Sequence, residues 1–131
     1  MPNNPSDFAL TLSGAPGVRS RTLDASQVGA ASAVELAHFI ADRAYTLASL
    51  SLSASDAGSA SATTATVNIN GVAVTGLLCT LDNAAANYAV ASDTPTAVTE
   101  IAAGDVLTLD IVSYATNATD LVLSAVLHEV V

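Results

Sequence analysis

Two segments in the last third of the sequence alternate apolar and polar residues with a period of two. They are "DVLTLDIVSY", residues 105–114, and "DLVLSAVLHEVV", residues 120–131. A period of two places every second side chain on one face of a β-strand, whereas an amphipathic helix repeats every 3.6 residues. We therefore predict two half-buried strands whose core residues are Leu107, Leu109, Ile111, Leu121, Leu123, Ala125 and Leu127.

The stretch "TVNINGVAVTG", residues 66–76, contains an Asn-Gly pair with alternating apolar residues on both sides. Both central residues of a type I′ turn take positive φ, which Asn and Gly tolerate best, and the twist of this turn suits a hairpin. The prediction is a tight hairpin at Asn70 and Gly71. Its cross-strand pairs would be Ile69 with Val72 and Val67 with Val74, all on one face.

Further short apolar segments are separated by turn residues. "VELAHFIA", residues 34–41, fits a strand or a helical turn, and we predict the strand. "AYTLASLSLSAS", residues 44–55, is predicted as a strand with a bulge near Ala48 and Ser49. "NYAVA", residues 87–91, would be a short edge strand. Seven to nine strands without a convincing helix predict an all-β, antiparallel β-sandwich that is jelly-roll-like or Ig-like.

The N-terminal segment has a different character. Residues 1–33 contain Pro2, Pro5 and the Pro16-Gly17 turn and show little periodicity apart from "FALTL". We predict an extended N-terminal arm over residues 1–33, followed by a single β-sandwich domain over residues 34–131. "MPNNPSDFAL" lacks the basic and apolar regions of a secretion signal, so we expect synthesis in the cytoplasm without secretion by that route.

The charge balance narrows the possible partners. The net charge is −9, and the chain has no lysine, so its only cationic side chains besides histidine are Arg19, Arg21 and Arg43. Such a chain repels nucleic acid and anionic membranes, and neither is expected as a partner. Residues 1–43 carry all three arginines against four acids, whereas residues 44–131 carry eight acids and no base. The N-terminal part is therefore best suited to contact another acidic surface.

No pattern of residues indicates catalysis or a cofactor. Cys79 lies alone within "GLLCTL" and is predicted to be buried, and His38 and His128 have no companions with metal-ligand spacing. The sequence contains neither a G-x-S-x-G motif nor a P-loop. The prediction is a non-enzymatic protein with no catalytic residues, no cofactor and no metal, although a calcium site built by Asp82, Asp93 and Asp120 from separate loops stays open.

The final strand has a second apolar face. Val122, Val126 and Val130 alternate with the predicted core residues, and the preceding strand offers Val106 and Val112 on its outer face. A two-sheet sandwich normally exposes that side. We therefore expect a further layer or another subunit to cover it.

Three motifs resemble those of a small β-sandwich module found in virion proteins of tailed bacteriophages. They are a hairpin of the "V-x-I-x-x-N-G" type, which here is shortened to "VNING" at residues 67–71, with an early "TLASLSLS" strand, "I-x-x-G-D-x-L-x-x-D" at residues 101–110, and the closing strand. The resemblance covers about residues 44–131. It implies an acidic structural protein without catalytic residues, either a head decoration (cement) protein or a tail or fibre appendage module, including receptor-binding modules.

The short chain favours decoration, which implies a place on the outer surface of the head, the major capsid protein as partner, and self-association as a trimer rather than a dimer. For these contacts the sequence suggests Arg19, Arg21, Arg43, Val122, Val126 and Val130. The arm of residues 1–33 would tie capsid subunits together.

Overall fold

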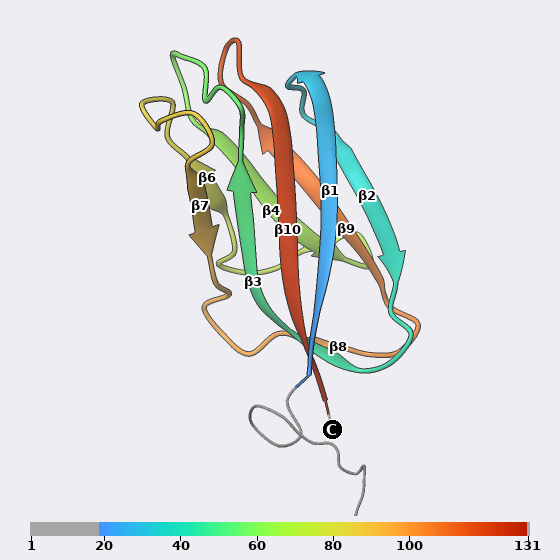
Figure 1. The fold of residues 1–131 in the computed structure, drawn as a ribbon. Helices are drawn as coiled ribbons and strands as arrows, with labels where there is room; N and C mark the ends of the chain where they lie inside the picture. Colours follow the sequence, from blue (N-terminus) through green and yellow to red (C-terminus); the bar gives the residue numbers. More distant parts are fainter. Residues whose placement is uncertain (1–18, 131) are drawn as a thin grey trace, which may run out of the picture.

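The protein is a sandwich of two five-stranded antiparallel sheets, seen in a computed structural model that describes residues 19–130 (Figure 1). The strands are β1 (Ser20–Ala30), β2 (Glu35–Ile40), β3 (Tyr45–Ser53), β4 (Thr63–Ile69), β5 (Val72–Ala73), β6 (Cys79–Leu81), β7 (Val90–Asp93), β8 (Glu100–Ile101), β9 (Val106–Ser113) and β10 (Thr119–Glu129). The predicted all-β sandwich is confirmed.

The strand order identifies the type of sandwich. One sheet, called sheet A below, has the order β1-β10-β3-β7, with β8 also paired to β3, and sheet B has the order β2-β9-β4-β5, with β6 also paired to β4. If β5 and β6 count as one interrupted strand of sheet B, and β7 and β8 as one interrupted strand of sheet A, the chain crosses between sheets at every connection except the β4–β5 hairpin. This is the arrangement of a jelly roll rather than an Ig-like fold.

The first strand corrects the predicted domain boundary. Ser20–Ala30 is an eleven-residue strand that pairs with β10 from Ser20↔His128 to Gln27↔Leu121, so an arm extending to residue 33 is wrong for this segment. Leu23 is buried, but Ala25, Gln27 and Gly29 are only partly buried. The apolar alternation was therefore too weak to predict a strand, and pairing with β10 defines it. Residues 1–18 of the predicted arm lie outside the described residues.

The core lies between the two sheets and contains the predicted leucines. Leu109, Leu121 and Leu123 are fully buried, and the other predicted core residues are at most 3% exposed. Side-chain size changes along the sandwich. Tyr45, Leu47 and Ile101 fill the core where β3 begins, whereas the loops at the opposite end bury the alanines Ala54, Ala57, Ala115 and Ala118.

Local predictions of turns and register are also confirmed. Asn70 and Gly71 have φ values of 51° and 83°, Ile69 pairs with Val72, and the Val74 N–H donates to the Val67 carbonyl. The register of β3 against β10 shifts between Ser49↔Val126 and Leu47↔Leu127, which leaves Ala48 as the bulged residue. Residues 34–41 contain β2. The predicted edge strand exists as β7 but covers Val90–Asp93 instead of residues 87–91, because Tyr88 has a positive φ of 64° and lies in a turn.

The sandwich has two distinct ends. The basal end is defined here as the end where β1 begins and β10 finishes, and the apical end carries the loops of residues 31–34, 54–62, 82–89 and 114–118 (Figure 1). No helix in the described part of the chain is long and apolar enough to cross a membrane.

Candidate interaction surfaces

The arginines meet at the basal end of the sandwich. Arg21 lies on β1 and Arg43 in the turn between β2 and β3, yet both bond to Asp42. The Arg21 Nη1–Asp42 Oδ1 distance is 3.0 Å and the Arg43 Nε–Asp42 Oδ2 distance is 3.1 Å. Arg43 Nη1 also lies 3.1 Å from Glu129 Oε1 at the end of β10. Three segments that are distant in sequence therefore form one charged cluster.

Tyr45 anchors this cluster to the core. The Tyr45 side chain is buried, and its hydroxyl donates a hydrogen bond to Asp42 Oδ1 and accepts one of 3.3 Å from Arg21 Nη1. The hydroxyl of Tyr45 lowers the pKa of the Asp42 carboxyl, and Arg43 lowers it further. Asp42 therefore stays ionised and keeps the two guanidinium groups in place.

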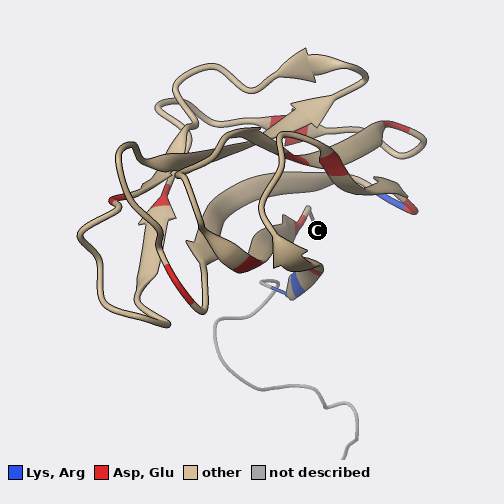
Figure 2. Ribbon diagram, turned by 90° about the horizontal axis from the view of Figure 1, so that it is seen from above, with Lys and Arg blue, Asp and Glu red and all other residues tan. Residues whose placement is uncertain are grey.

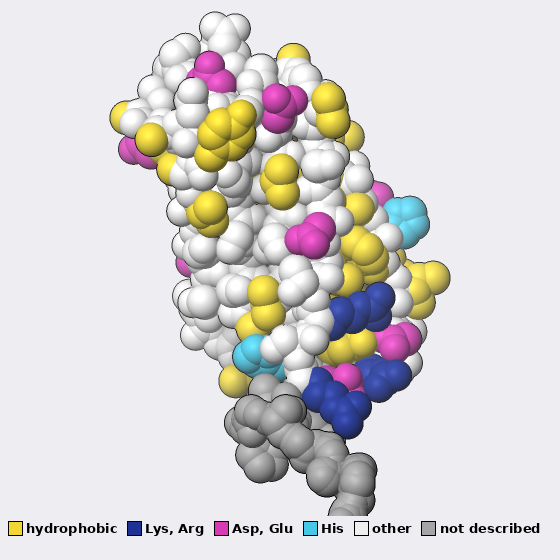
Figure 3. Space-filling model, viewed as in Figure 1, with side chains coloured by type: hydrophobic (Ala, Val, Ile, Leu, Met, Phe, Trp, Pro, Cys, Tyr) yellow, Lys and Arg dark blue, Asp and Glu magenta, His cyan; other side chains and the backbone are white. Residues whose placement is uncertain are grey.

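Arg19 completes the set of arginines at this end. It is exposed and immediately precedes β1, and its carbonyl accepts a 2.7 Å hydrogen bond from the Glu129 N–H. Figure 3 shows the basic side chains together at the basal end, and Figure 2 shows acidic residues spread over the rest of the ribbon. The chain has three arginines and no lysine, so all of its arginine and lysine charge lies at this end.

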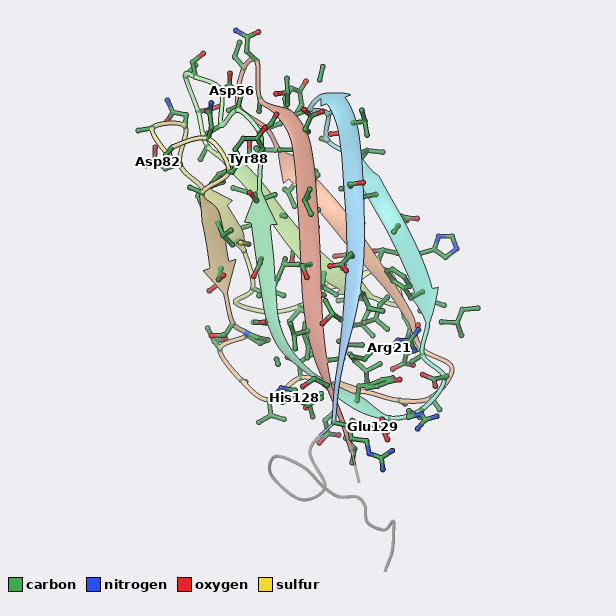
Figure 4. All side chains as sticks on the ribbon, viewed as in Figure 1. Arg21, Asp56, Asp82, Tyr88, His128 and Glu129 are labelled. Atoms are coloured by element: carbon green, nitrogen blue, oxygen red, sulfur yellow. The ribbon has the colours of Figure 1, made fainter. Side chains whose placement is uncertain are left out.

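The apical carboxylates bind backbone N–H groups. Asp56 accepts from Gly58 N–H, Asp82 from Ala84 N–H, and both distances are 2.8 Å. Asp120 accepts a 2.7 Å bond from the Gly29 N–H and a 2.8 Å bond from Ser55 Oγ, and these bonds lower the pKa of its carboxyl. Figure 4 shows Asp56 and Asp82 at this end, beside Tyr88. The acids here support loop conformations.

The three carboxylates considered for calcium are not gathered into one site. Asp93 accepts a 2.9 Å bond from the Leu78 N–H, whereas Asp82 and Asp120 hold the backbone elsewhere. Within residues 19–130, no three His, Cys, Asp or Glu side chains lie close enough to hold a metal ion. The two histidines are apart as well, because His38 bonds Glu35 on β2 and His128 lies on β10.

Cys79 is a buried side chain of β6. Its thiol donates a 3.3 Å hydrogen bond to the Ala91 carbonyl, and burial raises its pKa to about 11. At neutral pH the group is therefore a thiol rather than the nucleophilic thiolate. This fits the predicted structural role.

Two valines of the proposed contact set, Val122 and Val126, lie on the outer face of β10, and Val130 directly follows the strand. Val122 is 44% exposed and Val130 55% exposed, whereas Val126 is partly covered. Neighbouring strands place hydroxyl side chains beside them: Ser26 and Ser53 flank Val122, and Thr22 and Ser49 flank Val126. The outer face of sheet A is thus a mixed surface of valines, serines and threonines.

The grooves on the described surface are shallow and mostly apolar. One of about 390 Å³ runs beside the hairpin, between residues 72–75 and residues 96–100, with Val72 and Val98 exposed. Another of about 400 Å³ at the basal end has Glu100 and Asp105 in its wall. Hydrogen bonds from Asn70 Nδ2 and from the Ala102 N–H lower the pKa of Asp105, which makes it unsuited to donate a proton in catalysis.

The outer face of sheet B contains a polar pair, Asn68 and Asp110, that was not predicted from the sequence. Asn68 Nδ2 donates a 3.1 Å hydrogen bond to Asp110 Oδ2, while Asn68 Oδ1 and Asp110 Oδ1 are buried without a partner among the described residues. The alternation of β4 and β9 places both side chains on one face. Their contact depends on the pairing Thr66↔Asp110 and Asn68↔Thr108, which no local signal specifies.

Comparison with known proteins gives no family. No protein-family model matches the chain, and no curated protein matches its sequence. Three solved structures show similar folds at low identity. The catalytic unit of an α-1,3-glucanase of glycoside hydrolase family 87 from Streptomyces thermodiastaticus is 18% identical, with a TM-score of 0.43, and the match covers 88% of this chain but only 26% of that one.

The sugar-binding C-terminal domain of EclA is 15% identical, with a TM-score of 0.41 over 94% of this chain and 86% of that one. A chain of the cyanophage Pam1 capsid asymmetric unit is 16% identical, with a TM-score of 0.45 over 98% of this chain and 97% of that one. These similarities concern the fold and carry no argument about function.

Proposed function

We propose that this protein is a non-enzymatic structural component of a tailed-bacteriophage virion, a decoration protein that binds the major capsid protein on the outer surface of the head. The phage context rests on the resemblance of residues 44–131 to virion β-sandwich modules. Several copies associate and together hold neighbouring capsid subunits. Many weak contacts acting at once stabilise a shell without tight binding at any single site.

The separation of charge along the sandwich is the observation that carries this proposal. Arg19, Arg21 and Arg43 are all at the basal end, whereas acids are distributed over the whole molecule (Figures 2 and 3). The basal end also holds Asp42, Glu100, Asp105 and Glu129, so its charges nearly cancel, whereas the rest of the molecule carries acids without arginines. An acidic partner therefore repels the basal end least, which orients the protein on approach. The apical loops then point away from the capsid.

The valines of β10 are the second part of the proposed contact set. Val122 is exposed between Ser26 and Ser53, and Val130 is exposed just beyond the end of the strand. A surface that mixes apolar side chains with hydroxyls suits a protein that is first free in solution and later binds a partner. In this proposal Val122, Val126 and Val130 contact neighbouring molecules on the head. The arginines supply orientation, and the valines supply buried apolar area.

The decisive experiment mixes the purified full chain with phage heads assembled without it and measures co-sedimentation. We expect the wild-type chain to bind heads, and the triple variant Arg19→Gln, Arg21→Gln, Arg43→Gln to lose most of that binding. The matched control is Ala33→Asp, Ser59→Asp, Asn87→Asp, which changes the net charge equally at exposed apical positions and should bind like wild type.

Two results would overturn parts of the proposal. Equal binding by the arginine variant and by wild type would remove the arginines from the interface. Binding to isolated tails or to host cells, with none to heads, would replace decoration by the tail or fibre appendage role.

A further inference from the structure

The free edge of β1 is a long strand edge with no partner among the described residues. β1 lies at the end of sheet A and pairs only with β10 (Figure 1). A free strand edge presents unpaired N–H and C=O groups to which another chain can bond. The groups that point outward decide what can cover this edge.

The hydrogen-bonding pattern identifies the outward groups. The Glu129 N–H donates to the Arg19 carbonyl, so odd-numbered residues of β1 direct their backbone groups toward β10. Antiparallel pairs alternate between bonded and non-bonded, so the even-numbered residues direct theirs away from the sheet. The Gly29 N–H, which donates to Asp120 on the β10 side, agrees with this parity. The residues with outward groups in the regular part of the register are Ser20, Thr22, Asp24 and Ser26.

The segment Ser20–Gln27 of this edge has few of the devices that usually prevent strand addition, because the one bulge of β1 lies beyond Gln27. β1 has no proline and no lysine, and its register against β10 is unbroken from Ser20 to Gln27. The edges on the opposite side are different: β7 has four residues, and β5 and β6 have two and three. Short or interrupted strands offer little to a partner. β2, the edge of sheet B on the same side as β1, has six residues and a register shift between Glu35 and Ala37. The β1 edge is therefore the longest regular template for strand addition that the described residues provide.

Charge favours a second copy of the chain as the occupant. The protein carries a net charge of −9, but β1 contains one base, Arg21, and one acid, Asp24, and is neutral as a whole. Two copies can therefore approach each other along β1 without bringing clusters of acidic side chains together, so charge repulsion between them is small. We propose that β1 pairs antiparallel with β1 of a second copy across a two-fold axis, which joins the two A sheets into one.

Parity and charge select the register. Outward groups face each other only when even-numbered residues oppose even-numbered residues. A pairing centred on Asp24 would place two carboxylates directly opposite, which is unfavourable. A pairing centred on Leu23 sets Thr22 against Asp24 of the second copy and Ser20 against Ser26, and so uses every outward residue of the regular segment. It also brings the two Leu23 side chains together at the rim of the core, where Leu23 is 4% exposed.

This inference rests on the self-association included in the proposed function and names its surface. A two-fold contact closes on two copies. It therefore predicts a dimer, in place of the trimer that the resemblance to phage modules implies.

The first test measures the mass of the full chain in solution by light scattering. We expect twice 13.0 kDa for the wild type. Thr22→Pro removes an outward N–H without touching the bonds to β10, because proline is tolerated where the N–H of an edge strand faces solvent. This variant should be a folded monomer. The control Thr22→Val keeps the N–H and should remain a dimer.

A second test reads the register even if Thr22→Pro does not fold. The double variant Ser20→Cys, Ser26→Cys should form disulfide-linked dimers under mild oxidation, and neither single variant should, because residue 20 opposes residue 26 only in the pairing centred on Leu23. The native Cys79 is fully buried and should not contribute.

The outcomes separate this inference from the proposed function. A monomeric wild type that still binds heads would overturn the inference and the self-association, but not decoration. An oligomer that persists in Thr22→Pro, or that forms no disulfide between positions 20 and 26 in the double variant, would overturn the β1 contact and leave self-association through another surface.

Discussion

The two ends of the sandwich are built by different means. At the basal end, long side chains from three separate segments meet above a tyrosine anchored in the core, and the contacts between segments include ion pairs. At the apical end the contacts include backbone bridges, buried alanines and loop residues with positive φ, among them Ala60, Tyr88 and Asn117. Exposed side-chain contacts can be exchanged for contacts with a partner at little cost, whereas closely packed backbone cannot. The basal end is therefore suited to binding and the apical end to holding its shape.

The largest expected effect concerns Gly58 in the apical loops. Gly58 has a φ of 82°, and a Cβ there would overlap the Thr116 carbonyl oxygen and lie 2.8 Å from the Ala118 nitrogen. Gly58→Ala should therefore lower the free energy of unfolding by about 3 kcal/mol, because steric overlap with backbone adds to the φ penalty. Chemical denaturation measures the change.

Gly71 provides the control for that prediction. Its φ is 83°, but a Cβ there would meet no atom within 4 Å. Gly71→Ala should cost about 1 kcal/mol, since only the φ penalty applies. Equal losses of unfolding free energy in Gly58→Ala and Gly71→Ala would show that the apical loops can move apart to accept the extra methyl group. The apical end would then not be more rigid than the basal end.

A smaller loss is expected at a hydroxyl that supports the apical backbone. Thr63 is fully buried, and its Oγ1 accepts a 3.0 Å hydrogen bond from the Ala115 N–H. Thr63→Val leaves that donor without a partner, which should cost about 1 to 3 kcal/mol. The matched variant Thr64→Val removes an exposed 2.6 Å bond to Ser113 and should have a much smaller effect in the same denaturation assay. Comparable losses would mean that water reaches the Ala115 N–H.

The response to acid should involve both ends. Hydrogen bonds lower the pKa of Asp42 at the basal end and of Asp120 at the apical end, relative to the ordinary value of 3.8. A lowered folded-state pKa stabilises the protein above the unfolded-state pKa, and this contribution is lost as the pH falls below 3.8 through the folded-state pKa. The melting temperature should therefore decline in that range.

Substitution of either carboxyl should weaken this decline. Asp42→Asn and Asp120→Asn should each show a smaller difference in melting temperature between neutral and acidic pH than the wild type does. An unchanged pH profile in Asp120→Asn would show that its bonds to Gly29 and Ser55 do not favour the charged form.

The smallest effect on stability is expected for Arg43. It bonds Asp42 and Glu129 on the exposed basal surface, and ion pairs of this kind contribute little to folding. Arg43→Gln should leave the melting temperature almost unchanged while weakening binding to heads. A clear loss of stability in Arg43→Gln would mean that the basal cluster is structural, and would remove its contrast with the apical end.

Features that depend on neighbouring residues could be predicted from the sequence. Period-two alternation identified the core faces of β9 and β10, Asn70-Gly71 set the hairpin, and the phase change around Ala48 located a bulge. These signals are local because side-chain direction and turn geometry depend on residues only a few positions apart. The burial of Cys79 was predictable for the same reason.

Contacts between distant segments could not be predicted and are known only from the three-dimensional structure. β1 is a strand because it pairs with β10, and its own apolar alternation is too weak to predict it. The sandwich therefore starts at residue 20 instead of the predicted residue 34. Residues 21, 43 and 129 share one cluster because their strands meet at the basal end. Such contacts follow from the order of strands in the two sheets, which alternation does not encode. The free edge of β1 has the same origin, since an edge exists only once the sheet is complete.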